Sequence, residues 1–210
     1  MCGIAGIIRF DGGPAQPELL ARMSRVLEHR GPDDRGVFTD GAVGLAHQRL
    51  SIIDLATGHQ PMESARAVIV FNGEIYNYLE LRSELMARGR TFRTASDTEV
   101  ILQLYEEYGA EAVARLNGMF AFVLYDRVER QLLLAREAAE LDALARFATA
   151  VVQIRVDANT GRVDEARRRL AALRRDVGGG TRAGNQRRLR RHLPGREQPS
   201  RQLPGMERQR

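Results

Sequence analysis

Residues 1–10 read MCGIAGIIRF and place Cys2 directly before an apolar run. The run Gly3–Phe10 is short and rich in β-branched residues, which predicts a buried strand. Because a methionine before a small residue is normally removed, we expect Cys2 to carry a free α-amino group. Such an amine has a pKa near ~7.7–8.0 and can accept the thiol proton, so one residue supplies both nucleophile and base. Position alone leaves an inert buried cysteine open as the alternative.

The composition of the remaining chain excludes several kinds of site. The 210 residues include one cysteine and 32 basic residues, all of them arginine, so intramolecular disulfides, thiol-rich metal sites and Schiff-base lysines are excluded. Residues 1–136 hold 15 arginines against 18 acidic residues, whereas residues 137–210 hold 17 against 9. The first part therefore gives no electrostatic reason to expect nucleic acid. No apolar run is long enough for a membrane span and no secretory signal is seen, so we expect a cytoplasmic protein.

Strands and helices are predicted in mixed order up to Arg136, as in a layered α+β domain. The periodicity and the capping box Ser96–Glu99 predict these helices: Pro17–His29, Asn77–Arg88 and a third ending near Tyr108. Apolar runs predict these strands: Ala42–Leu50, Ala67–Phe71, Gly118–Tyr125 and Gln131–Arg136. The last two strands form a hairpin around Asp126 and Arg127.

Further motifs follow MCGIAGIIRF in a fixed order. They are LEHRGPDDRG (27–36), LAHQRLSIIDL (45–55), GHQPM (58–62), FNGEIYNYLELR (71–82), SDTEVILQLYEEYG (96–109) and LNGMFAFVLYD (116–126). Together they closely resemble the amidotransferase domain of glutamine-hydrolysing asparagine synthetases, which is a class II glutamine amidotransferase. The HRGPDD and RLSIIDL motifs favour this branch over the glucosamine-phosphate and purine branches. The resemblance implies a four-layer αββα fold of the N-terminal-nucleophile type, with two antiparallel sheets between helical layers.

The resemblance also implies roles for individual residues. Cys2 would attack the glutamine amide, while Asn72 and Gly73 form an oxyanion hole through a side-chain amide and a backbone N–H. Arg49 would bind the α-carboxylate of glutamine, because a guanidinium binds a carboxylate bidentately. Asp97 would pair with the α-ammonium. The remaining residues implied in glutamine binding are Leu50, Ser51, Ile52, Ile53 and Glu74.

Each of these roles has a plainer alternative. Arg49 alone could form a surface ion pair, and Asp97 could simply favour the helix dipole. The Asn72–Gly73 pair could form a hairpin turn, but its place between a buried strand and EIYNYLELR favours the site. We expect four further polar residues to be structural or to order loops: His29, Arg30, Asp33 and His47.

The resemblance ends after Arg136. We therefore expect three parts: an amidotransferase domain without its C-terminal strands (1–136), a divergent helical segment (137–177) and a disordered basic tail (178–210). The Arg-rich end resembles out-of-frame translation, which favours a truncated or frameshifted gene. No Ser-Gly-Gly-x-Asp-Ser loop occurs, so the ATP-dependent synthetase domain is expected to be absent. Missing strands would leave bare sheet edges, so we expect the chain to fold poorly.

The leading functional hypothesis is hydrolysis of L-glutamine to glutamate and ammonia for asparagine biosynthesis. The alternatives are another class II amidotransferase, an inactive remnant and, more distantly, a basic adaptor that binds nucleic acid through its tail. The resemblance implies no cofactor and no metal for this domain, and ATP with Mg for the absent synthetase domain. A synthetase domain would be needed to use the ammonia, and a homodimer stays open for full-length members. Neither a membrane nor nucleic acid is expected as a partner.

Overall fold

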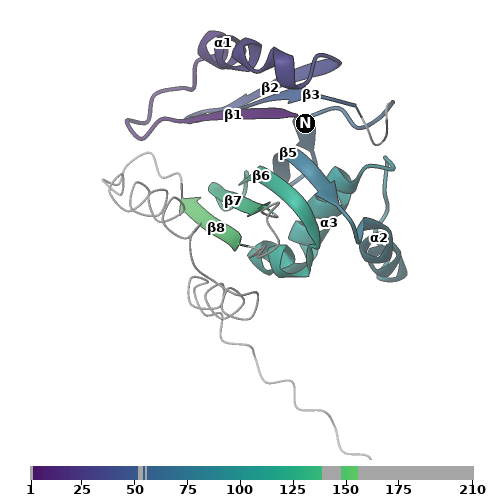
Figure 1. Ribbon diagram of the computed structural model, residues 1–210. Coiled ribbons are helices and arrows are strands. Elements are labelled where there is room, and N and C mark those ends of the chain that lie inside the picture. Colours follow the sequence, from purple (N-terminus) through teal and green to yellow (C-terminus); the bar gives the residue numbers. More distant parts are fainter. Residues whose placement is uncertain (1, 52–53, 55, 139–147, 156–210) are drawn as a thin grey trace, which may run out of the picture.

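Four layers make up the part of the chain that the computed structural model describes, which is residues 2–51, 54, 56–138 and 148–155. Two antiparallel sheets pack face to face, and helices lie on their outer faces (Figure 1). This arrangement confirms the expected α+β fold with two sheets between helical layers. None of the described helices is both long and apolar enough to cross a membrane.

The first sheet has three strands in the order β1-β3-β2. Its elements are β1 (Gly3–Ile8), α1 (Pro17–Val26), the 3-10 helix η1 (Glu28–Arg30), β2 (Asp34–Asp40) and β3 (Val43–Arg49). The central strand β3 is buried along its whole length, between its two neighbours and two packed layers. Helix α1 lies so close to β3 that a side chain at Gly44 would collide with Leu20. The sheet thus brings the start of β1 beside the end of β3.

The second sheet has five strands in the order β4-β5-β6-β7-β8. Its strands are β4 (Met62–Glu63), β5 (Ala67–Ile75), β6 (Gly118–Asp126), β7 (Gln131–Ala138) and β8 (Ala148–Arg155). Its helices are α2 (Tyr78–Ala87), α3 (Asp97–Tyr108) and the 3-10 helix η2 (Gly109–Arg115). Strand β4 pairs with only two residues of β5, so the second half of β5 has a strand neighbour on one side only.

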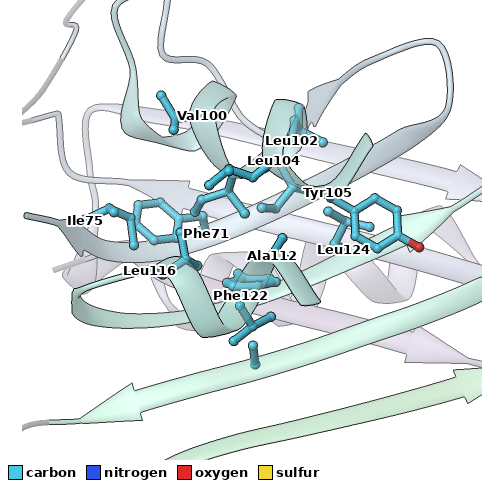
Figure 2. Close-up of a cluster of buried hydrophobic side chains, with 14 of the residues drawn as sticks. Phe71, Ile75, Val100, Leu102, Leu104, Tyr105, Ala112, Leu116, Phe122 and Leu124 are labelled. Atoms are coloured by element: carbon cyan, nitrogen blue, oxygen red, sulfur yellow. The ribbon is translucent and has the colours of Figure 1, made fainter. Parts of the chain in front are cut away.

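Strand β5 belongs to two cores because its side chains alternate between the faces of the sheet. Val68 and Val70 face the first sheet and pack in a cluster with Val43 and Leu45. Phe71 faces the other way, where side chains of α3 meet those of β5 and β6 (Figure 2). Each fully buried aliphatic or aromatic side chain contributes ~1.5–3 kcal/mol. The strand that continues into Asn72 and Gly73 is therefore held firmly on both faces.

The structure adds strands that the sequence pattern did not predict. Strand β2 was missed because it lies at the sheet edge, where DRGVFTD mixes polar and apolar residues without a continuous apolar run. Strand β4 is only two residues long, too short for any pattern to show. Strand β5 extends beyond the predicted end at Phe71 as far as Ile75, because Asn72–Glu74 pair with β6.

The predicted capping box at α3 is wrong in one half. Ser96 Oγ accepts a hydrogen bond from Thr98 N at 3.2 Å, as an N-cap side chain should. The Glu99 carboxylate does not reach back to Ser96 N. It accepts instead from Arg93 N at 2.9 Å and from Thr94 N at 2.7 Å. Glu99 therefore orders the loop that precedes the helix.

The prediction of a helical segment at 137–177 is wrong where the structure describes it. Strand β7 runs to Ala138, and β8 pairs with every residue of β7. The sequence ATAVVQIR contains β-branched residues that suit a strand, although its alanines had suggested a helix. The sheet therefore does not end in a bare β7 edge, which was the premise for poor folding. The expectations for 139–147 and 156–210, including the disordered tail, lie outside the described residues.

Candidate active site

A pocket lies where the start of β1, the end of β3, the second half of β5 and the first turn of α3 meet. Its volume is about 170 Å3, below the ~300–1,000 Å3 of sites for drug-sized ligands. The lining residues are Cys2, Arg49, Leu50, Gly58, Gln60, Phe71, Asn72, Gly73, Glu74, Ser96, Asp97, Thr98 and Met119. The site thus has the size for a small metabolite and collects residues that are far apart in the sequence.

Cys2 is fixed at the pocket wall through its sulfur and through its backbone carbonyl. Its Sγ accepts a hydrogen bond from Leu50 N at 3.3 Å and lies 3.6 Å from Leu50 O. The Arg30 Nε donates to the Cys2 carbonyl at 3.1 Å. These contacts hold Sγ beside the Leu50 backbone at the wall of the pocket.

Arg49 brings a guanidinium to the pocket from the last position of β3. Its side chain is buried, and Nη2 donates to the backbone oxygen of Asp54 at 2.5 Å. A side chain at Gly58 would collide with this guanidinium, so the glycine makes room for it. Because a guanidinium presents several donors in one plane, Arg49 can hold Asp54 and still bind an anionic ligand group.

Asp97 brings a carboxylate to the pocket from the first position of α3 and is only 3% exposed. Burial raises the pKa of Asp97, against the lowering effect of hydrogen bonds from the Ile75 and Thr98 N–H groups, and Glu74 adds to the rise. A cationic ligand group beside Asp97 would stabilise the charged carboxylate. The pocket is therefore lined by one guanidinium and by one buried carboxyl group.

The free edge of β5 directs N–H groups toward the pocket. Phe71 N donates to Gln60 Oε1 at 2.6 Å, and Ile75 N donates to Asp97 Oδ2 at 3.2 Å. Because N–H direction alternates along a strand, the N–H of Gly73 between them is expected at the same edge. Gly73 has φ +150°, and a Cβ there would collide with Met119 O, so only glycine fits. Its place inside β5 rules out the alternative of a hairpin turn at Asn72–Gly73.

Residues 1–144 match the family model described as a glutamine amidotransferase domain. The chain belongs to this glutamine amidotransferase family. The match extends beyond the boundary expected at Arg136 and covers every residue that lines the pocket.

The curated relatives of this amidotransferase domain include glutamine-hydrolysing asparagine synthetases. The one from Bacillus subtilis is 47% identical over 144 residues, which cover 65% of this chain and 22% of the relative. The one from Arabidopsis thaliana is 45% identical over 147 residues, covering 69% of this chain and 25% of the relative. A putative one from Methanocaldococcus jannaschii is 40% identical and is covered to 30%. The chain thus spans about a quarter of the length of these relatives.

Two solved structures share the fold. A glutamine phosphoribosylpyrophosphate amidotransferase from B. subtilis aligns with a TM-score of 0.52 and 20% identity, covering 73% of this chain and 41% of that one. An allosteric regulatory enzyme of purine biosynthesis aligns with a TM-score of 0.53 and 19% identity, covering 65% and 37%. At such low identity the likeness concerns the fold alone, and it supports the expected architecture of two sheets between helical layers.

The pocket of the amidotransferase domain contains most, but not all, of the residues predicted for it. Cys2, Arg49, Leu50, Asn72, Gly73, Glu74 and Asp97 line it. Ser51 is not among the lining residues, and its N–H donates to Asp33 Oδ2 at 2.8 Å. Ile52 and Ile53 lie outside the described residues. Within the described ranges, no three His, Cys, Asp or Glu side chains form a group that could hold a metal ion.

The four polar residues expected to be structural all contact the backbone. Arg30 holds Cys2, and Asp33 holds Ser51. The His29 Nδ1 lies 3.0 Å from Val26 O. The His47 Nε2 lies 3.0 Å from Phe71 O.

Several lining residues were not predicted as part of the site. The amidotransferase pocket also uses Gly58, Gln60, Phe71, Ser96, Thr98 and Met119. Gln60 belongs to the motif GHQPM, so the signal was present without an assigned role. Asp54 does not line the pocket but orders it: its Oδ2 accepts from Ala95 N at 2.8 Å, while its backbone oxygen holds Arg49.

Proposed function

We propose that this amidotransferase domain hydrolyses the side-chain amide of L-glutamine, with Cys2 as the nucleophile, to supply ammonia for asparagine synthesis. The observation that carries the proposal is the convergence of Cys2, Arg49, Gly73 and Asp97 on one small pocket. A thiol, an anion binder, a cation binder and a backbone donor are what the two ends of glutamine require.

Binding would use the polar groups at the amino-acid end of glutamine. Arg49 binds the α-carboxylate and Asp97 pairs with the α-ammonium, because both charged side chains line the pocket. Leu50 and Glu74 complete the wall in this proposal. The contributions of Ser51, Ile52 and Ile53, implied by the family resemblance, remain part of the proposal.

The first chemical stage would release ammonia. After removal of Met1, the α-amine of Cys2 takes the thiol proton, and Sγ forms a bond to the amide carbon. The carbonyl oxygen becomes an oxyanion that accepts hydrogen bonds from Gly73 N–H and the Asn72 side-chain amide. The oxyanion then re-forms the carbonyl and the C–N bond breaks. The leaving nitrogen takes the proton that the α-amine of Cys2 had accepted, and it departs as ammonia.

The second stage would regenerate the enzyme. Water attacks the γ-glutamyl thioester and gives one proton to the α-amine, and the same donors hold the new oxyanion. The C–S bond then breaks, the proton returns to the sulfur, and glutamate leaves. The net reaction consumes glutamine and water and yields glutamate and ammonia, with no redox change.

The use of the ammonia goes beyond the matched residues. We propose that it serves asparagine synthesis, because the curated relatives carry that name. ATP and Mg would then act in a synthetase part that the match to residues 1–144 does not include. We also propose a cytoplasmic location and a homodimer, which likewise go beyond the matched residues.

Glutamate release from glutamine by the purified protein tests the proposal. We expect release by wild-type protein and none by Cys2→Ala, because the chain has no other thiol. The intact mass of the active fraction should correspond to a chain without Met1, since the α-amine of Cys2 must be free. Wild-type protein that releases no glutamate would contradict the proposal, and full activity with Met1 retained would contradict the role of the amine.

A further inference from the structure

The backbone of Phe71 is held by two buried side chains in place of a neighbouring strand. Gln60 Oε1 accepts from Phe71 N at 2.6 Å, and His47 Nε2 lies 3.0 Å from Phe71 O. His47 is fully buried and Gln60 is 4% exposed. Strand β4 pairs only with Val68 and Ile69, so it does not reach this part of β5. The two side chains therefore bind the backbone N–H and C=O of Phe71, which β4 does not reach.

The hydrogen bond from His47 fixes the state of its ring. A carbonyl oxygen only accepts, so Nε2 carries the hydrogen and Nδ1 carries a lone pair. Among the described residues nothing donates to Nδ1, which is buried. Burial lowers the pKa of His47 to about 4, in spite of the opposing effect of the Phe71 carbonyl. The ring is thus a neutral donor to Phe71, and it ties the first sheet to the second.

Gln60 has a second contact that connects β5 to α3. Its Nε2 donates to Thr98 Oγ1 at 3.4 Å, and Thr98 follows Asp97 in the first turn of the helix. One amide side chain therefore joins the strand that carries Asn72 and Gly73 to the helix that carries Asp97. The fixed point at Phe71 lies one residue before Asn72 and two residues before Gly73. Oxyanion donors act only when they lie within hydrogen-bond distance of the developing charge, so a small shift at Phe71 moves them out of reach.

We propose that Gln60 and His47 are positioning residues for the oxyanion donors of the glutamine-hydrolysing reaction. Gln60 holds the N–H of Phe71 and His47 holds its carbonyl, and together they set the position of Asn72 and of the Gly73 N–H. The inference rests on the proposed function, because it assigns a role within the same pocket. Neither residue transfers a proton or touches the sulfur.

The variant Gln60→Met tests this role, with Gln48→Met as the matched control. Gln48 is also a buried glutamine whose Nε2 donates to a backbone oxygen, that of Ser24 at 3.1 Å, on the α1 side of the first sheet. We expect Gln60→Met to lower kcat roughly 10-fold or more, short of the ~10²–10³-fold effect of losing a donor itself. Its KM should change less than about threefold, and Gln48→Met should keep wild-type kcat.

An aldehyde analogue of glutamine adds a readout that a purely structural role would not move. The Cys2 thiol adds to the aldehyde carbon of glutamate γ-semialdehyde and gives its proton to the aldehyde oxygen, and the resulting hemithioacetal hydroxyl lies where the oxyanion would lie. Its inhibition constant should rise for Gln60→Met by about the factor lost in kcat/KM. The rate at which iodoacetamide alkylates Cys2 should stay at the wild-type value, because the thiol itself is untouched.

The pair His47→Gln and His47→Leu keeps the proposal falsifiable if Gln60→Met does not fold. The glutamine places an N–H near the position of Nε2 and should retain kcat within about threefold, whereas leucine has no donor and should behave like Gln60→Met. Equal kcat for His47→Gln and His47→Leu would overturn the proposal. So would wild-type kcat in Gln60→Met, or an equal loss in Gln48→Met. If wild-type protein does not hydrolyse glutamine, the proposed function fails first and this inference fails with it.

Discussion

At the scale of single residues, the proposed reaction divides the pocket into groups that bind glutamine and groups that act on the reacting carbon. Arg49 and Asp97 carry the charges suited to the amino-acid end of a ligand, whereas Asn72 and Gly73 offer uncharged donors. The sequence predicted that these residues share a site because the family motifs surround each one, and they do line one pocket. It could not reveal the role of Gln60, since its bond to Phe71 spans 11 residues and depends on where β4 ends.

Kinetics of three variants should divide these residues into two groups. Arg49→Ala and Asp97→Asn should mainly raise KM, because they hold parts of glutamine remote from the reacting carbon. Asn72→Ala should mainly lower kcat, by roughly 10²–10³-fold, because it removes an oxyanion donor. Steady-state assays of glutamate release measure both constants. The opposite pattern would show that the binding and chemical roles are exchanged.

His47 should make the stability of the fold depend on pH. Its pKa is about 4 in the folded chain, because burial outweighs the bond to Phe71, with Arg49 and His59 lowering it and Asp34 raising it. An unfolded histidine has a pKa of ~6.5, so between these values the unfolded chain binds a proton that the folded chain does not. The folded state should therefore lose about 3 kcal/mol as the pH falls from ~6.5 to 4, with no loss above that range.

Urea titrations of wild type and His47→Gln at several pH values can measure this effect. Glutamine does not titrate, so the unfolding free energy of the wild type should fall more than that of the variant as the pH falls. The carboxylates are common to both proteins and cancel in the comparison. A difference that stays constant from pH 7 to 4 would mean that His47 becomes protonated within the fold.

At the scale of elements, sequence patterns found the strands and helices that bury one clear apolar face. They missed β2 and β8 for different physical reasons. The edge strand β2 has no continuous apolar face. The alanines of β8 are typical of a helix, so the sequence of this segment indicates a strand only once its partner strand is known. Propensity is a weak guide when the deciding interaction is a ladder to β7.

Proline substitutions in β8 should show whether its ladder supports β7. Val151 and Val152 are adjacent, so only one of their N–H groups points toward β7. One of Val151→Pro and Val152→Pro should therefore lower the unfolding free energy by about 1–3 kcal/mol, whereas the other should cost less. Thermal unfolding of both variants provides the measurement, and each serves as the control for the other. Wild-type stability in both would contradict the pairing.

At the scale of the whole molecule, the matched residues and the pocket occupy the same part of the chain. All the lining residues lie between Cys2 and Met119. The last strand of the second sheet, β8, ends at Arg155. The resemblance predicted this domain, but it could not show that a divergent segment supplies another strand. The outer edge of the second sheet thus lies at β8 instead of β7, and poor folding stays a prediction.

Truncated chains should locate the end of the functional part. A chain of residues 1–155 should keep the kcat and KM of the full chain, because it retains both sheets and the pocket. A chain of residues 1–147 lacks β8 and should aggregate or bind a hydrophobic dye, because the edge of β7 is then bare. Gel filtration and glutamate release distinguish these outcomes. Loss of activity in the longer chain would show that residues 156–210 contribute to the fold.

The two halves of the pocket come from different sheets. Cys2 and Arg49 belong to the strands under α1, whereas Asn72, Gly73 and Asp97 belong to the layer of β5 and α3 (Figure 1). Sliding of one sheet over the other would separate the proposed nucleophile from the proposed oxyanion donors without breaking any ladder. In mild denaturant, enzymatic turnover should therefore disappear before the far-ultraviolet circular dichroism changes, so that catalysis reports on registration between the layers rather than on secondary structure.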